Sequence, residues 1–166
     1  MKPHEDTNAD TPQDETPEPR ELLLLRAGAH AFAVFADETD GVADGLKPTP
    51  LPHAPRAVLG VVCVRGRMRT VLDPLALVGD NEETESATAS TPLFIVALRG
   101  DEQLALAAES DAGVVRINID NITPPDTADP SLRGTFEHDG ARVLVLDPSR
   151  LFDAALRGTE RRRRRT

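Results

Sequence analysis

The chain has 166 residues, of which 39 % are hydrophobic, so it is long and apolar enough to fold as one globular domain with a real core. Its formal net charge of -9 argues against a protein whose main partner is nucleic acid, since phosphate contacts need a basic face. A single cysteine excludes an intramolecular disulfide, and only 3 % aromatic residues mean that small aliphatic side chains fill the core.

Three segments lack apolar periodicity and are expected to lie outside the folded part. Residues 1–19 form an acidic, proline-rich N-terminal tail, residues 79–92 a polar linker, and residues 158–166 a tail that contains Arg161–Arg165. The N-terminal tail does not look like a secretory signal, and the longest apolar run is far shorter than the roughly 20 residues of a membrane helix. These features predict a cytoplasmic protein.

The two remaining blocks, residues 20–78 and 93–157, carry the same order of elements. In each block an apolar strand leads to a turn at Gly28 or Gly100, followed by a second strand and a proline-bearing loop. A last strand then runs into Asp-Pro and a short helix, with Asp73 and Asp147 as helix caps. The pattern of many short strands separated by turns is typical of small all-β barrels.

The two blocks also match residue by residue. RGRMRTVLDPLAL at residues 65–77 resembles DGARVLVLDPSRL at residues 139–151, with identical residues 74 positions apart. Paired glycines six residues apart, each pair followed by VLDP, indicate an internal duplication: Gly60 and Gly66 match Gly134 and Gly140. At the end of the second block, one helical face holds four apolar residues and predicts a docked terminal helix: Leu151, Phe152, Ala155 and Leu156.

No group of residues predicts catalysis. The repeated aspartates invite an acid-base interpretation, but the following proline favours helix caps. Cys63 lies between apolar neighbours in a strand, which favours a buried thiol over a reactive one. The four histidines are scattered, and no nucleotide-binding or serine-hydrolase motif is present. We expect no enzyme, no catalytic residue, no metal and no cofactor.

The Arg161–Arg165 run is the one basic cluster. It is typical either of a solubilising tail or of a segment drawn to an acidic surface, lipid headgroups or RNA. A small β-barrel that binds nucleic acid through this tail and RGRMR is therefore the alternative function, although acidity and the lack of stacking aromatics count against it.

Residues 20–157 as a whole resemble the CheW family of chemotaxis coupling proteins. The first half gives LLLLRAGAHAFAVF, ETDGV, PHAP, LGVVCVRG and RTVLDPLAL, and the second gives LFIVALRGDEQLALAAESDAGVV, SLRG and ARVLVLDPSRLF. In GVVCVRG, four residues match the family motif, whereas Cys63 replaces the usual asparagine. Gly41 stands where the family has an acid, beside Asp40.

The resemblance implies an all-β fold of two SH3-like five-stranded barrels, with subdomain halves at about 20–78 and 93–157 and short helices after Asp73 and Asp147. It also implies a non-catalytic adaptor at cytoplasmic receptor arrays. Such an adaptor couples chemoreceptor tips to the regulatory domain of a CheA-like histidine kinase.

Carried onto this chain, the resemblance implies two sets of binding residues. The receptor would bind to residues at the glycine turn and in the strands next to it: Arg65, Gly66, Val64, Ile95 and Val96. The kinase would be met by Val42 and Asp40. A charge-assisted hydrogen bond from Arg65 to a receptor helix is the expected anchor.

Overall fold

The computed structural model describes residues 18–78, 93–125 and 130–156. The expected N-terminal tail (apart from residues 18 and 19), the linker at 79–92 and the C-terminal tail lie outside the described residues. Among the residues that are described, no helix is long and apolar enough to cross a membrane.

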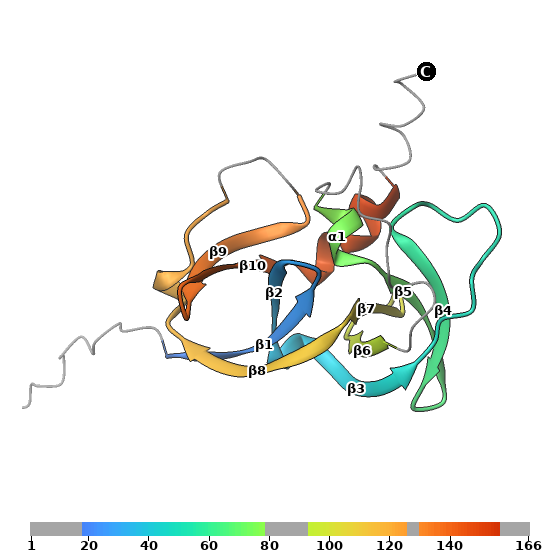
Figure 1. Ribbon diagram of the computed structural model, residues 1–166, viewed down its shortest axis with the longest axis horizontal. Helices are drawn as coiled ribbons and strands as arrows, with labels where there is room; N and C mark the ends of the chain where they lie inside the picture. The colour runs from blue at the N-terminus through green and yellow to red at the C-terminus, as the bar shows by residue number, and fades with distance from the viewer. Residues whose placement is uncertain (1–17, 79–92, 126–129, 157–166) are drawn as a thin grey trace, which may run out of the picture.

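The chain folds into two five-stranded sheets that lie side by side (Figure 1). Sheet A has the order β8-β1-β2-β10-β9, with β1 (Arg20–Ala27), β2 (His30–Phe35), β8 (Ser110–Ile117), β9 (Leu132–His138) and β10 (Ala141–Leu146). Sheet B has the order β3-β6-β7-β5-β4, with β3 (Thr39–Leu46), β4 (Val58–Val64), β5 (Arg67–Leu72), β6 (Leu93–Leu98) and β7 (Leu104–Ala108). The predicted all-β fold of two five-stranded units is confirmed.

Each sheet closes on itself through one isolated bridge. In sheet B the segment after β3 returns to β4, where Thr49 exchanges two 2.9 Å backbone hydrogen bonds with Val61. In sheet A the segment after β8 returns to β9, where Thr123 and Thr135 exchange two bonds of 2.8 Å. The bridges occupy equivalent places in the two halves, so the duplication extends to the way in which each sheet becomes a barrel.

These bridges explain one pair of repeated glycines. A Cβ atom on Gly60 would lie 2.2 Å from the carbonyl oxygen of Thr49, and one on Gly134 would lie 2.6 Å from that of Thr123. No side chain fits where the two backbones approach this closely. The glycines are therefore kept in both halves by the closure of the barrels.

The expectation that each sequence half forms its own subdomain is wrong. The first half gives β1 and β2 to sheet A and then crosses into sheet B, and the second half begins in sheet B and crosses back. The crossing segments are the 3-10 helix η2 (Ala36–Glu38) and the β7–β8 connection. Long-range pairings between β1 and β8 and between β3 and β6 tie the halves together, and local sequence patterns do not show such pairings.

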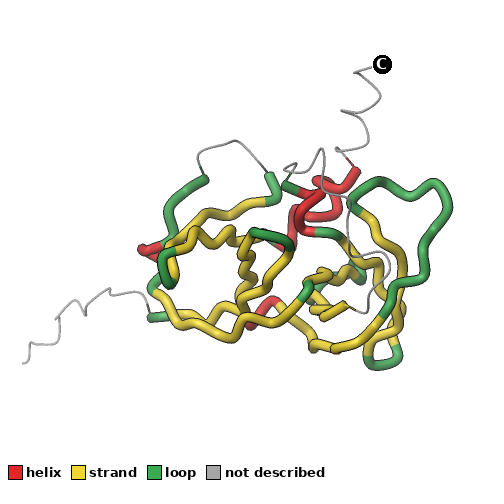
Figure 2. Tube along the Cα trace, viewed as in Figure 1, coloured by secondary structure: helices red, strands yellow, loops and turns green. Residues whose placement is uncertain are grey.

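The helical segments after Asp73 and Asp147 lie together between the two sheets (Figure 2). As predicted, Asp73 caps α1 (Pro74–Leu77), and Asp147 caps the 3-10 helix η5 (Pro148–Arg150), which leads into a helical segment at 151–156. The largest apolar cluster joins these segments to both sheets, and its members include Phe32, Leu72, Leu77, Leu106 and Leu151.

Two details of burial differ from expectation. In the last helical segment Leu151 and Ala155 are buried, but Phe152 and Leu156 are 44 % and 47 % exposed, so only half of the predicted apolar face is docked. Cys63 is exposed rather than buried. Strand alternation in β4 points Val62 and Val64 inward and turns the thiol outward.

Candidate interaction surface

The RG dipeptide of the CheW-like motif forms the tip of the β4–β5 hairpin. Val64 pairs with Arg67, which leaves Arg65 and Gly66 as a two-residue turn with φ angles of 53° and 81°. Two consecutive positive φ angles define the type I′ turn, which matches the twist of the strands on either side. The turn lifts the Arg65 side chain out of the strand and exposes it.

The hairpin carries cations beside exposed apolar side chains. Arg65 and Arg67 are exposed and have no ion pair within the described part of the chain. Met68 is 60 % exposed and lies opposite Cys63 in the β4–β5 ladder, so the two sulfur-bearing side chains share the outer face. Unpaired charge next to apolar surface is typical of a protein-binding patch.

The structure brings the tip against β3. A Cβ atom added to Gly41 would lie 2.9 Å from Nε and 3.0 Å from Cζ of Arg65, so the guanidinium lies directly over this glycine. The next residue, Val42, is 47 % exposed. Arg65 therefore lies over the residue that precedes Val42, although the two were expected to meet different partners. We use the name tip–β3 surface for the exposed residues of the hairpin tip together with Val42: Val42, Arg65, Gly66, Arg67 and Met68.

Asp40 has a structural partner. Its Oδ2 atom accepts a 2.8 Å hydrogen bond from Nη2 of Arg69, whose side chain is only 3 % exposed. Nη1 of Arg69 donates to the carbonyl oxygen of Leu98 at 2.7 Å, which ties β5 to the end of β6. Asp40 thus neutralises a buried cation, and we leave it out of the tip–β3 surface.

Three of the expected receptor contacts lie in the core. Ile95 and Val96 are completely buried in β6, which pairs on both edges, and Val64 is 3 % exposed. Side chains without accessible surface cannot line a groove in this fold. The error came from treating an apolar strand as a surface, when its near-complete burial makes it the middle of sheet B.

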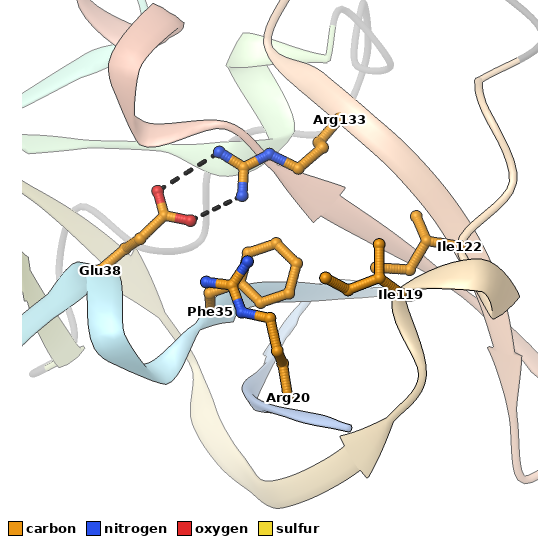
Figure 3. A pocket seen from close by; sticks show the side chains of 6 residues that line it. All are labelled: Arg20, Phe35, Glu38, Ile119, Ile122 and Arg133. Atoms are coloured by element: carbon orange, nitrogen blue, oxygen red, sulfur yellow. Dashed lines mark hydrogen bonds and ion pairs between the residues drawn. The ribbon is translucent and has the colours of Figure 1, made fainter. Parts of the chain in front are cut away.

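A second region with concentrated charge lies on sheet A and was not found from the sequence. An open pocket of about 520 Å³ is lined by Arg20, Phe35, Glu38, Ile119, Ile122 and Arg133 (Figure 3). The guanidiniums of Arg20 and Arg133 lie over the Phe35 ring, with Cζ atoms 3.7 and 4.9 Å from its centre. Such stacking is a cation–π contact.

Both arginines of the pocket are neutralised by carboxylates. Arg133 donates to Oε1 of Glu38 at 2.6 Å and to Oδ1 of Asp147 at 3.2 Å, and Arg20 donates to Asp37 at 2.8 Å. Asp37 and Glu38 belong to η2, where the chain crosses between sheets. The pocket residues thus hold the crossing in place. Sequence reasoning missed them because Arg133 and Glu38 are 95 positions apart.

The carboxyl groups of the two helix caps have pKa values shifted in opposite directions. Burial raises the pKa of Asp73, and backbone hydrogen bonds from Leu75 and Ala76 only partly oppose it. Burial also acts to raise the pKa of Asp147, but hydrogen bonds from Ser149 and the charge of Arg133 outweigh it, so the pKa of Asp147 is lowered. Among the described residues, no three His, Cys, Asp or Glu side chains form a group suited to hold a metal ion.

Comparison with known proteins matches this chain to one family along almost its whole folded part. The model of the CheW-like domain matches residues 21–156. A protein named chemotaxis protein CheW from Rhizobium meliloti (strain 1021) is 26 % identical over 133 residues, which cover 80 % of this chain and 81 % of that protein. Protein FrzA from Myxococcus xanthus is 28 % identical over 142 residues, with coverages of 82 % and 87 %.

The fold also has a counterpart among solved structures. The crystal structure of the scaffolding protein TtCheW from Thermoanaerobacter tengcongensis aligns with a TM-score of 0.66 at 19 % identity, over 81 % of this chain and 93 % of that one. The repeated turns, the two closed sheets and the family match over residues 21–156 lead to one conclusion: the chain belongs to the CheW-like domain family.

Proposed function

We propose that this protein is a non-catalytic adaptor of chemotaxis-type signalling. It couples the cytoplasmic tips of chemoreceptors to the regulatory domain of a CheA-like histidine kinase, in the cytoplasm at receptor arrays. Membership of the CheW-like family supports this role, as does a surface that offers docking groups rather than reacting ones.

The observation that carries the proposal is the pair of unpaired cations on the tip–β3 surface. Arg65 and Arg67 are exposed in the same hairpin as the exposed Met68, and Arg65 reaches β3 at Gly41, the residue before the exposed Val42. An apolar contact excludes water, and the exclusion of water strengthens the hydrogen bond that a neighbouring arginine donates to a carboxylate. The surface therefore suits a helical segment that presents carboxylates beside apolar side chains, which is the chemistry we assign to the receptor tip.

The kinase contact is assigned to the exposed part of β3. Val42 offers the apolar surface there, and β3 lies at one end of the strand order of sheet B. The expected carboxylate contact from Asp40 is not carried forward, because Asp40 is engaged by Arg69. We expect this interface to depend on apolar contact more than on charge.

Three purified proteins test the adaptor role: the full chain, the regulatory domain of a CheA-like kinase and a receptor-tip fragment, the last two from the organism that encodes this chain. In size-exclusion chromatography, we expect the chain to elute with each partner, and the two partners to elute together only when the chain is present. A chain that binds neither partner contradicts the proposal. Steeply salt-dependent RNA binding, lost when residues 158–166 are removed, would support the nucleic-acid alternative.

A further inference from the structure

The position of Arg65 is restricted from two sides. Its backbone is held in the left-handed region by the type I′ turn, at a φ of 53°. Its side chain lies over β3, where the nearest atoms to a Cβ built on Gly41 are Nε, Cζ and Cδ of Arg65, at 2.9, 3.0 and 3.3 Å. Any side chain at residue 41 would occupy the space that the guanidinium now fills.

Nothing else in the described structure explains this placement of the side chain. Arg65 forms no ion pair with a described residue, so no carboxylate of its own barrel draws it toward β3. Arg69 has already taken the neighbouring carboxylate of Asp40. The guanidinium thus lies against the bare backbone of Gly41, and its charge has no ion-pair partner among the described residues.

We propose that Gly41 is a positioning residue for partner recognition, because it lets the Arg65 side chain lie across the backbone of β3 and present its guanidinium there. The inference rests on the proposed function, since it takes the receptor tip as the partner. An arginine already held in place loses less side-chain freedom when it meets a carboxylate than a freely rotating one does. Gly41 thus determines where the partner's carboxylate must lie, without touching the partner.

The chain supplies a matched control for this proposal. Gly41 and Gly45 are both in β3, with φ angles of 111° and 77°, so alanine is strained at either position. A Cβ atom on Gly45 meets nothing within 4 Å, whereas one on Gly41 meets Arg65. Both substitutions therefore place alanine at a positive φ, and only Gly41→Ala also displaces Arg65; the Arg65→Ala background separates that displacement from the larger backbone strain at residue 41.

Affinity for a purified receptor-tip fragment, measured by calorimetry on folded full-length variants, tests the proposal. We expect Gly41→Ala to weaken binding about tenfold or more, as Arg65→Ala does, because each removes one positioned charge-assisted hydrogen bond. Gly45→Ala should stay within about twofold of the wild type, and Gly41→Ala/Arg65→Ala should bind no more weakly than Arg65→Ala. Unchanged affinity in Gly41→Ala overturns the inference, whereas absence of wild-type binding overturns the proposed function.

A second measurement needs neither a partner nor a substitution. In the wild-type protein, nitrogen NMR relaxation of the arginine side chains should give Nε of Arg65 a higher order parameter than Nε of Arg67, because the Arg65 guanidinium lies against β3. Arg67 is the internal reference, because it is exposed and has no ion pair or hydrogen bond within the described residues. If the two order parameters are equal, Gly41 does not position the side chain.

Discussion

Sheets A and B follow the same path and close in the same way, yet they differ in charge. The described residues of sheet B and its connections, 39–78 and 93–108, hold six basic and five acidic side chains. Those of sheet A, 18–38, 109–125 and 130–156, hold six basic and eleven acidic ones. The two halves thus retain the same strand order and closure, whereas their surface charges have diverged.

The hairpin tips show this divergence at single residues. Arg65–Gly66 in sheet B and Asp139–Gly140 in sheet A are both two-residue turns, with first-residue φ angles of 53° and 51°. The same turn thus presents a cation on one sheet and, on the other, a carboxylate that is 89 % exposed. A type I′ turn requires positive φ but does not fix the charge of its first residue, so the two halves can carry opposite charges at this position.

Gly60 and Gly134, the glycines at the bridges that close the two barrels, give the largest expected difference in stability between the sheets. Gly60→Ala should lower the free energy of unfolding by about 4 kcal/mol, because the new Cβ meets the Thr49 backbone and the residue also has a φ of 148°. Gly134→Ala should cost about 2 kcal/mol, because its Cβ meets Ile122 and Thr123 without the strain of a positive φ. Urea unfolding measures both. A larger cost at Gly134 would contradict this account of closure.

The next largest effect on stability is expected at the ion pair of the buried Arg69 in sheet B. Asp40→Ala leaves the Arg69 charge buried without its carboxylate and should cost about 3 kcal/mol, at the lower end for a broken buried pair because Asp40 is partly solvated. Asp44→Ala, an exposed carboxylate of the same strand, is the control and should change stability by less than about 0.5 kcal/mol. Equal effects of the two substitutions in urea unfolding would mean that Arg69 does not depend on Asp40.

The two helix caps give the smallest difference in stability. Asn caps helices about as well as Asp, so at pH 7 Asp73→Asn should change the free energy of unfolding by less than about 0.5 kcal/mol. Asp147→Asn should cost about 1 kcal/mol, because it also removes the charge that pairs with Arg133. Urea unfolding of the two variants at pH 7 compares the costs directly, and a larger loss from Asp73→Asn would reverse our assignment.

Acid should affect the same two caps in opposite directions. The lowered pKa of Asp147 gives stability that is present above its ordinary value of 3.8 and is lost as pH falls through the lowered pKa. The raised pKa of Asp73 gives stability that is present below 3.8 and is lost as pH rises through the raised pKa. Between pH 7 and about pH 3, the penalty of Asp147→Asn should shrink and that of Asp73→Asn should grow. Parallel changes would show that the caps titrate alike.

The features that sequence reasoning predicted correctly are local ones. Asp73–Pro74 and Asp147–Pro148 identify helix starts because capping chemistry is contained in two adjacent residues. The duplication is visible because glycines used in barrel closure and in the hairpin turns recur at the same spacing in both halves. The exchange of strands between halves depends on pairings far apart in the chain, which periodicity does not report.

The site residues were predicted less completely, for the same reason. Arg65 and Val42 are exposed, as a binding role requires, but the sequence did not show that Arg65 reaches β3 at the residue before Val42. The burial of Ile95 and of the Arg69 charge is decided by neighbouring strands rather than by adjacent residues. Cys63 was misassigned because apolar neighbours suggested burial, whereas strand alternation turned it outward.

We propose that sheet B, not sheet A, carries the receptor surface, at the tip of its β4–β5 hairpin. This proposal is tested most directly by the affinity of a purified receptor-tip fragment for Arg65→Glu and Arg116→Glu. Both variants make the same charge change at exposed arginines, one on the tip of sheet B and one in β8 of sheet A. We predict that Arg65→Glu loses most of the binding and that Arg116→Glu binds like the wild type. Equal affinities in the two folded variants would contradict the account.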